Sequence, residues 1–233
     1  MKASDKTIER IYNAAEQLFA ERGFTETSLR SITAEAEVNL AAVNYHFGSK
    51  EGLIKAIFSR YLTQFCSELE KKLDYYESKQ NATPSTEELL SIFMELIVSI
   101  KTHSSKGVVT FMRLFSNALL QKQLFLHEYM TNDFGIVFYR FGLMLRKAAH
   151  NDNISEVEWF WRLHFSLGTI LLNIASMEYF KTLMKKEFKT SIKISQVIQL
   201  MAPYITAGLL AAPVLKDETL VNAKYDISKL TEN

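Results

Sequence analysis

The chain has 233 residues, of which 48% are hydrophobic and 12% aromatic, with only eight glycines and three prolines. So few glycines and prolines in so apolar a chain argue against a β-sandwich, a β-barrel or a disordered protein, and a single cysteine, Cys66, excludes an internal disulfide framework. The net charge of +1 lacks the positive excess that is the simplest signature of a nucleic-acid-binding protein.

Apolar residues recur at helical spacing along the chain, and the alternation typical of a strand is missing. A leading helix is expected to end at Gly23, where a C-terminal cap belongs, and a long fourth helix is expected to begin at Ser49. The expected helices after the leading one cover about residues 28–36, 40–47, 49–77, 86–103, 106–121, 124–149, 155–180 and 192–212. The predicted fold class is therefore all-α, with about nine helices.

The segment 27–50 contains two short helices joined by a turn of about three or four residues, which is the geometry of a helix-turn-helix. The second of these helices would bury Val43 and Phe47. Its outward residues would be Leu40, Ala41, Asn44, Tyr45 and His46. Such a face fits the DNA major groove, where Leu or Ala contacts thymine methyls and Asn pairs with adenine. Since many helical hairpins share this spacing, the periodicity leaves DNA binding and plain packing both open.

The local motifs are more specific than the periodicity: LFAERGF, TSLRSI, VNLAAVNYHF and GSKEGL follow one another along the chain. With them, residues 8–62 resemble the N-terminal domain of the TetR family of transcriptional regulators. The combination of AAEQLFAERGF with NLAAVNYHFGSKEGLI is most similar to the PsrA-like regulators, which respond to long-chain fatty acids. The resemblance implies a homodimeric repressor that binds a palindromic operator in double-stranded DNA and is released by a hydrophobic effector.

By position, the resemblance implies a positioning helix over residues 28–36 and a recognition helix over residues 40–46. The implied base contacts are Arg30, Leu40, Ala41, Ala42 and Asn44. The implied phosphate contacts are Thr27, Ser28, Tyr45, His46 and Lys50. Other interpretations stay open at this stage: Tyr45 could be a packing aromatic, Arg30 a solvated surface charge and His46 a structural residue.

The charge of the predicted DNA-binding region is balanced, with eight basic and eight acidic residues among residues 1–60. Affinity for DNA must then come from the placement of a few cations, with two subunits on one operator. Glu37 stands in the turn where the family usually has Gly. Either the turn avoids positive φ, or the domain core absorbs a cost of about 1 kcal/mol.

The C-terminal helices carry more phenylalanine and methionine than bundle packing needs. The plain interpretation is a packed core, and the functional one is an elongated apolar cavity for an acyl chain or another lipophilic effector. Arg140 and Arg146 are further candidates for its head group. The predicted ligand contacts are Phe111, Met112, Arg113, Phe115, Phe138, Phe141, Met144 and His164.

The last two expected helices carry small residues on otherwise apolar surfaces. In this family the final two helices usually pair with their symmetry mates, which favours a dimer interface over packing within one chain. The predicted interface residues are Gly168, Ala175, Ala202, Ala207, Gly208 and Ala211. The predicted units are a helix-turn-helix domain over 1–48, a connecting helix over 49–77, a ligand-binding and dimerisation domain over 78–213 and a polar tail over 214–233.

Rival functions are a drug-sensing regulator with the same fold, and a helical carrier or lipid-modifying enzyme in which the hairpin is incidental. No nucleophile motif, paired carboxylates or clustered His and Cys support catalysis, so we expect no enzyme, no cofactor and no metal. The N-terminus, MKASDKTIER, lacks the apolar segment of a secretory signal. The most apolar stretch, residues 200–215, is shorter than the roughly 20 residues of a spanning helix. The sequence therefore predicts a soluble, cytoplasmic protein without a membrane partner.

Overall fold

The structure is a computed structural model that describes residues 3–79, 84–100, 107–150, 153–216, 218–222 and 224. Within these ranges the chain forms eleven helices and no strand, which confirms the all-α prediction. The helices are α1 (Ala3–Glu26), α2 (Leu29–Glu35), α3 (Leu40–Phe47), α4 (Lys50–Ser78), α5 (Thr86–Ser99), α6 (Gly107–Leu120), α7 (Leu124–Ala148), α8 (Glu156–Ala175), α9 (Met177–Phe188), α10 (Ile194–Leu210) and α11 (Glu218–Val221). None of these helices is long and apolar enough to cross a membrane.

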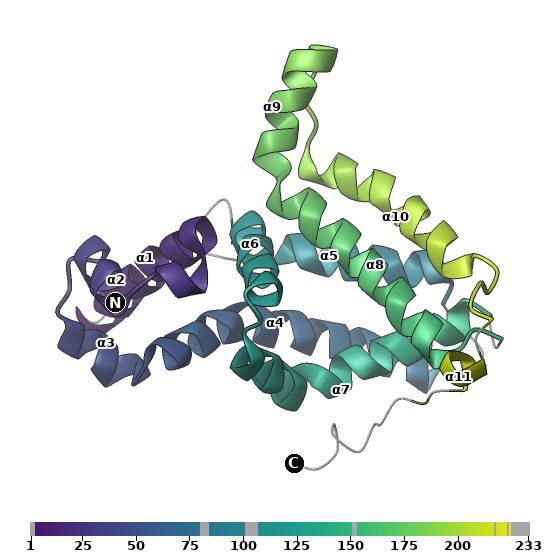
Figure 1. Cartoon of the computed structure of the whole chain (residues 1–233), viewed down its shortest axis with the longest axis horizontal. Helices are drawn as coiled ribbons and strands as arrows, with labels where there is room; N and C mark the ends of the chain where they lie inside the picture. The colour runs from purple at the N-terminus through teal and green to yellow at the C-terminus, as the bar shows by residue number, and fades with distance from the viewer. Residues whose placement is uncertain are drawn as a thin grey trace.

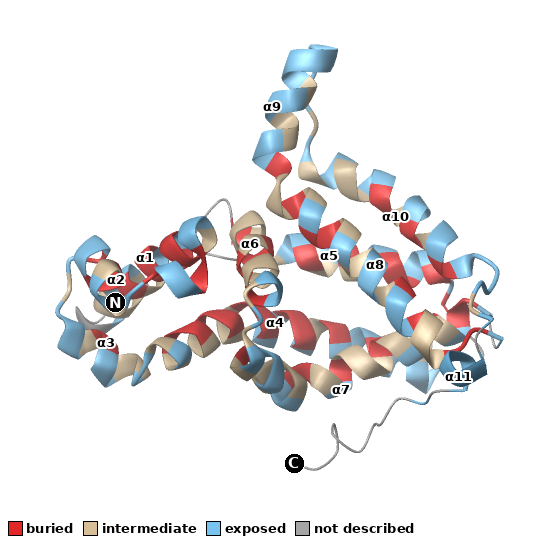
Figure 2. Ribbon diagram, viewed as in Figure 1, coloured by how far each residue is buried: buried red, intermediate tan, exposed pale blue. Residues whose placement is uncertain are grey.

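The molecule has a small N-terminal unit and a larger bundle, joined by one long helix. Helices α1, α2 and α3 lie together at one end, and α4 runs from them into the bundle of α5 to α8 and α10, while α9 projects away from it (Figure 1). Buried residues form an almost continuous stripe along α4 (Figure 2). The stripe contains Leu53, Ile57, Phe58, Tyr61 and Phe65. One helix therefore belongs to the cores of both units.

Side chains of N-cap residues stabilise the starts of α2, α3 and α4, close to where the sequence predicts them. The Ser28 hydroxyl accepts the Ser31 N–H at 3.0 Å, and the Ser31 side chain accepts the Ser28 N–H in return. Asn39 accepts the Ala41 N–H at 2.8 Å, and Ser49 accepts the Gly52 N–H at 3.0 Å. Each cap satisfies a backbone donor that has no partner within its helix.

The described residues form eleven helices, where about nine were expected. The expected helix over 155–180 ends at Ala175, and α9 begins at Met177. Nε of Arg113 in α6 donates to the Ala175 carbonyl at 2.9 Å and so takes up an acceptor that a continuous helix would use itself. The other addition, α11, lies in the expected polar tail.

A buried arginine closes the end of α10. Arg162 on α8 donates to the carbonyls of Leu209 at 3.0 Å and Ala211 at 2.6 Å, and its Nη2 pairs with Glu158 at 2.7 Å. Burial of Glu158 opposes its ionisation, but hydrogen bonds from the Leu215 N–H and from Arg162 outweigh it and hold the pKa of the carboxyl below its usual value. The arginine thus satisfies carbonyls that the last turn of a helix leaves without partners.

Candidate nucleic-acid interface

Helix α3 presents one open face. Val43 is fully buried, whereas Tyr45 is 85% exposed and Leu40 is 36% exposed. Ala41 and Asn44 are exposed on the same helix, and Arg30 is exposed on α2. The second helix of the hairpin therefore leaves outward most of the side chains that the sequence places there.

Two of the implied DNA contacts are placed differently. Thr27 is fully buried, and its hydroxyl donates to the carbonyls of Gly23 at 2.8 Å and Leu18 at 3.2 Å. The side chain of Thr27 consequently ties the end of α1 to the start of α2 and has no free hydroxyl for a phosphate, which corrects the expectation. Ala42 is partly buried and packs against the core instead of facing outward.

The remaining implied phosphate contacts lie at the start of α2, at the end of α3 and at the start of α4. Ser28 is exposed, and His46 lies between the rings of Tyr45 and Phe47, with centroids at 5.0 and 6.2 Å. Lys50 is half-buried; this burial lowers the pKa of its amine, and the Glu26 carboxylate opposes the shift. A phosphate near Lys50 would favour the charged amine in the same way as Glu26 does.

The turn before α3 contains a left-handed residue that is not glycine. Glu37 has φ of 48°, so the turn does not avoid the positive region. Nη2 of Arg10 in α1 donates to the Glu37 carbonyl at 3.0 Å and pairs with its carboxylate at 2.8 Å. This double contact from α1 holds the strained residue in place and partly offsets a negative charge close to the DNA-facing side.

A joint that sequence reasoning missed connects α6 to the end of α1. Oε1 of Gln121 accepts the N–H groups of Phe24 at 2.8 Å and Thr25 at 3.1 Å, just after Gly23 interrupts the helix with φ of 80°. Asn117 donates to the Phe19 carbonyl at 2.9 Å. No local pattern marks Gln121 or Asn117, because the partners of each lie almost a hundred residues away in the sequence.

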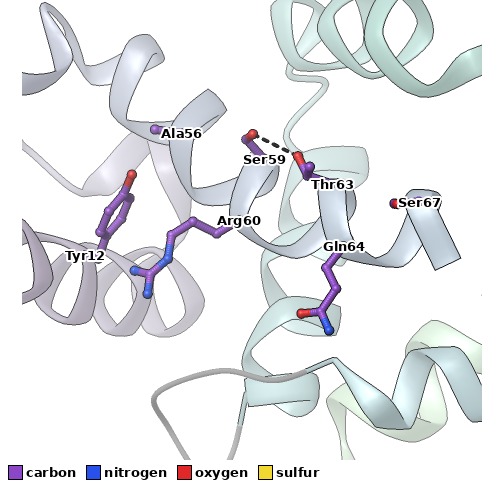
Figure 3. Close-up of a pocket in the computed structure, with 7 residues that line it drawn as sticks. All are labelled: Tyr12, Ala56, Ser59, Arg60, Thr63, Gln64 and Ser67. Atoms are coloured by element: carbon purple, nitrogen blue, oxygen red, sulfur yellow. Dashed lines mark hydrogen bonds between the residues drawn. The ribbon is translucent and has the colours of Figure 1, made fainter.

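Polar contacts also link α1 to α4. The Tyr61 hydroxyl donates to the buried Glu16 at 2.7 Å, while Arg60 lies over the Tyr12 ring at 4.1 Å. Tyr12 and Arg60 face one another along a groove of about 560 Å³ (Figure 3). Its other lining residues are Ala56, Ser59, Thr63, Gln64 and Ser67. This groove lies between α1 and α4 and is lined by none of the predicted ligand residues.

The predicted ligand residues lie mostly in a packed core. Phe111 stacks on Tyr61 with centroids at 4.5 Å, and Phe141 stacks on Phe93 at 4.9 Å. Phe138 lies 6.1 Å from the ring of Phe65. Met112 is buried, and Phe115 and Met144 are partly buried against the same core. The structure thus brings most of these apolar residues together, but they pack against one another and do not line an open cavity.

The candidate head-group residues are engaged elsewhere, which corrects their expected placement. Arg113 bonds the Ala175 carbonyl, and Arg146 donates to the Ile154 carbonyl at 2.6 Å. Arg140 pairs with Asp74 and Glu77, and these hydrogen bonds raise the pKa of its guanidinium further above its usual value. His164 is exposed on α8, with its Nδ1 2.7 Å from the Phe160 carbonyl.

Helices α8 and α10 share an exposed apolar surface. Of the predicted interface residues, Gly168, Ala207, Gly208 and Ala211 are exposed, whereas Ala175 and Ala202 are partly turned inward. Sequence reasoning missed the large members of this surface, since a helical pattern alone does not say which of two apolar faces meets the core. They are Trp161, Phe165, Leu172, Leu200 and Tyr204.

Comparisons with known proteins agree with this architecture. The solved structure of a HlyIIR mutant protein superimposes with a TM-score of 0.59, at 21% identity over 88% of this chain and 98% of that one. A TetR-like transcriptional regulator from Rhodococcus sp. RHA1 gives 0.54, at 18% identity over 87% and 95% of the two chains. At these identities the likeness shows the fold.

Curated relatives match the N-terminal part. "Probable HTH-type transcriptional regulator YttP" of Bacillus subtilis is 32% identical over 97 residues, which are 42% of this chain and 44% of that protein. The HTH-type transcriptional repressor Rv3405c of Mycobacterium tuberculosis is 44% identical over 60 residues, 26% and 32% of the two chains. The match thus spans less than half the length of either relative. Both relatives are described as HTH-type regulators of transcription, the first as a probable one.

Two family models cover most of the chain. The model for bacterial regulatory proteins of the tetR family matches residues 11–57, which contain the helix-turn-helix. The model for the tetracyclin repressor-like C-terminal domain matches residues 91–208, just over half of the chain. The chain therefore belongs to the TetR family of bacterial transcriptional regulators.

Proposed function

We propose that the protein is a homodimeric repressor that inserts α3 of each copy into successive major grooves of a palindromic operator. The observation that carries this proposal is the open face of α3 next to the exposed Arg30 of α2. Two such helices reach successive grooves of one DNA face when they lie about 34–36 Å apart. The balanced charge of residues 1–60 makes one copy a weak binder, so that affinity depends on the pair.

The proposed roles follow exposure and chemistry. Arg30 would donate two hydrogen bonds to guanine, Asn44 would pair with adenine, and Leu40 with Ala41 would contact thymine methyls. The proposed backbone contacts are Ser28, Tyr45, His46 and Lys50.

The test is operator binding by the double variant Arg30→Ala/Tyr45→Ala. With about 1–3 kcal/mol per specific contact, the loss of affinity is expected to exceed roughly a hundredfold while the circular dichroism spectrum stays unchanged. The matched control is Arg22→Ala/Tyr75→Ala, which removes an exposed arginine on α1 and an exposed tyrosine on α4 away from α3. Equal operator affinity of the two double variants, measured by fluorescence anisotropy, would refute the proposed DNA face.

The proposed dimer pairs α8 and α10 of two copies. Its support is the exposed apolar surface of these helices, on which Phe165 is 66% and Tyr204 71% exposed. Gly168 and Gly208 face open space in a single chain, because a Cβ added at either position would meet nothing within 4 Å. Residues as small as these let the backbones of two helices approach closely. Large apolar side chains exposed together on neighbouring helices are characteristic of an interaction site.

The proposed effector is hydrophobic, a long-chain fatty acid or acyl-CoA. Its support is the cluster of aromatic rings between α4, α6 and α7, which includes Phe65, Phe111 and Phe138. Because these rings pack on one another, an acyl chain must part the helices to enter. Parting them would move α4 and the α6 joint at Gln121, and a coupling of about 1–3 kcal/mol weakens operator binding roughly 5–150-fold.

Mass spectrometry of lipids that co-purify with the protein tests the effector, and a gel-shift titration with the lipid tests induction. A bound fatty acid or acyl-CoA that releases the operator is the expected result. Acyl ligands that bind and leave operator affinity unchanged would contradict induction, and release by drug-sized compounds alone would favour the rival drug sensor. The proposed units keep the expected boundaries of 1–48, 49–77 and 78–213, followed by the tail.

A further inference from the structure

Helix α9 stands apart from the rest of the described molecule. It leaves the end of α8 and projects outward, so that along most of its length no other helix lies beside it (Figure 1). The structure describes all 12 of its residues, and Met177 is the one that is buried. A lone helix of this length is marginal in water, since most helix stability in proteins comes from packing an apolar face. Within a single chain α9 therefore lacks the packing that would stabilise it.

The sequence of α9 supplies an apolar face for such packing. Tyr179 is 66% exposed, and Leu183, one helical turn later, is exposed on the same side. These residues continue a stripe on α8, where Trp161, Phe165 and Leu172 are also exposed. The exposed positions 161, 165, 168 and 172 of α8 are spaced by four, three and four residues, which is the pattern of a seam between two helices. Tyr179 follows Leu172 after seven residues, beyond the break between α8 and α9.

We propose that α9 is an arm that docks on a second copy of this chain and extends the interface of α8 and α10. This inference rests on the homodimer of the proposed function. The second copy is the occupant because the apolar residues of α9 are continuous with the surface on which the two copies would meet. A two-fold axis that crosses α8 makes the α8 helices of the two copies run in opposite directions. Helix α9 of one copy then lies beside the start of α8 of the second copy.

Charge agrees with this arrangement. Helix α9 carries Lys181, Lys185 and Lys186 against Glu178 and Glu187, and Lys189 follows directly after it, so that the end of the arm has a net positive charge. The start of α8 is acidic, with Glu156 and Glu158 in its first turn. Glu158 is already held by Arg162, whereas the side chain of Glu156 is 30% exposed. Lysines at the end of one arm would thus approach Glu156 of the second copy, where opposite charges favour the correct orientation.

The test compares dimer dissociation constants of full-length variants by sedimentation equilibrium. Tyr179→Glu/Leu183→Glu is expected to raise the constant at least about tenfold, because charges would enter an apolar contact. The matched control, Tyr75→Glu/Leu143→Glu, changes an exposed tyrosine on α4 and an exposed leucine on α7 and is expected to leave the constant unchanged. A dimer that is equally stable in both variants overturns the arm and leaves the homodimer standing. A wild-type protein that stays monomeric overturns both.

A second measurement needs no variant. Hydrogen exchange of the wild-type amides in 178–188 is expected to slow when the protein is concentrated from below to above its dimer dissociation constant, while 63–73 in α4 exchanges equally at both concentrations. Unchanged exchange of 178–188 overturns the proposal. A membrane as the occupant would also overturn it. In that case the wild type would sediment with phosphatidylglycerol vesicles and the α9 variant would not, while the dimer dissociation constant would be the same for both proteins.

Discussion

Glycine has different surroundings in two regions of the molecule, at Gly23 near the end of α1 and at Gly168 within α8. At Gly23 the backbone has φ of 80°, and an added Cβ would overlap the Gln121 amide that binds the end of α1. At Gly168 an added Cβ meets nothing within 4 Å. The first glycine serves a contact that is complete within one chain, whereas the second faces open space on an apolar surface. The N-terminal joint is thus satisfied by the monomer, and the face of α8 and α10 is not.

The largest expected effect on stability concerns Arg162, whose contacts with the end of α10 are satisfied within one chain. Arg162→Leu would leave Glu158 and the last carbonyls of α10 without their partner, so the free energy of unfolding is expected to fall by about 3–5 kcal/mol. Urea denaturation measures it. Arg140→Leu is the control, since its partners Asp74 and Glu77 are exposed and a loss of less than about 1 kcal/mol is expected. Equal losses would show that the α10 cap is a surface contact.

Gly23→Ala addresses the closed side of the comparison. The left-handed backbone disfavours any side chain, and the Gln121 amide would have to move, so we expect a loss of about 1–3 kcal/mol in the free energy of unfolding. Thermal unfolding measures the change. Unchanged stability would mean that the end of α1 rearranges freely and that the α6 joint does not hold it.

Gly168→Ala addresses the open side. Within one chain the substitution is expected to stabilise α8 by roughly 0.5–1 kcal/mol, because alanine loses less backbone entropy than glycine in a helix. In the proposed dimer the same methyl group would separate closely packed helices and raise the dissociation constant. The expected result is a higher free energy of unfolding of the monomer together with a weaker dimer in sedimentation. A tighter dimer would contradict close approach of two helices at this position.

The smallest effect concerns pH. Since the folded-state pKa of Glu158 is lowered, its contribution to stability is complete above the unfolded-state pKa and is lost as pH falls through the folded-state pKa. Acid should therefore loosen the end of α10, and Glu158→Gln should flatten the fall in stability below about pH 4.3. Urea midpoints between neutral and acidic pH measure this slope. A variant as acid-sensitive as the wild type would assign the loss to other carboxylates.

The helix-turn-helix was predictable because its determinants are local. Capping by Ser28, Asn39 and Ser49 and the periodicity of α4 depend on residues within one or two turns, so the helix starts and the open face of α3 follow from the sequence. The Glu37 turn was only half predictable. Its position could be recognised, but whether it takes positive φ depends on Arg10, which lies 27 residues earlier.

What the sequence alone determined was the all-α class and the placement of the hairpin, because apolar periodicity and caps are local signals. Only the tertiary structure decided that Thr27 is buried, that Arg113 ends α8 at Ala175 and that His164 lies on the outer face. It also separated two apolar faces of α8, one packed on α6 and one open. These outcomes depend on partners distant in sequence, and hydrophobicity states only that a face must be covered, not which surface covers it.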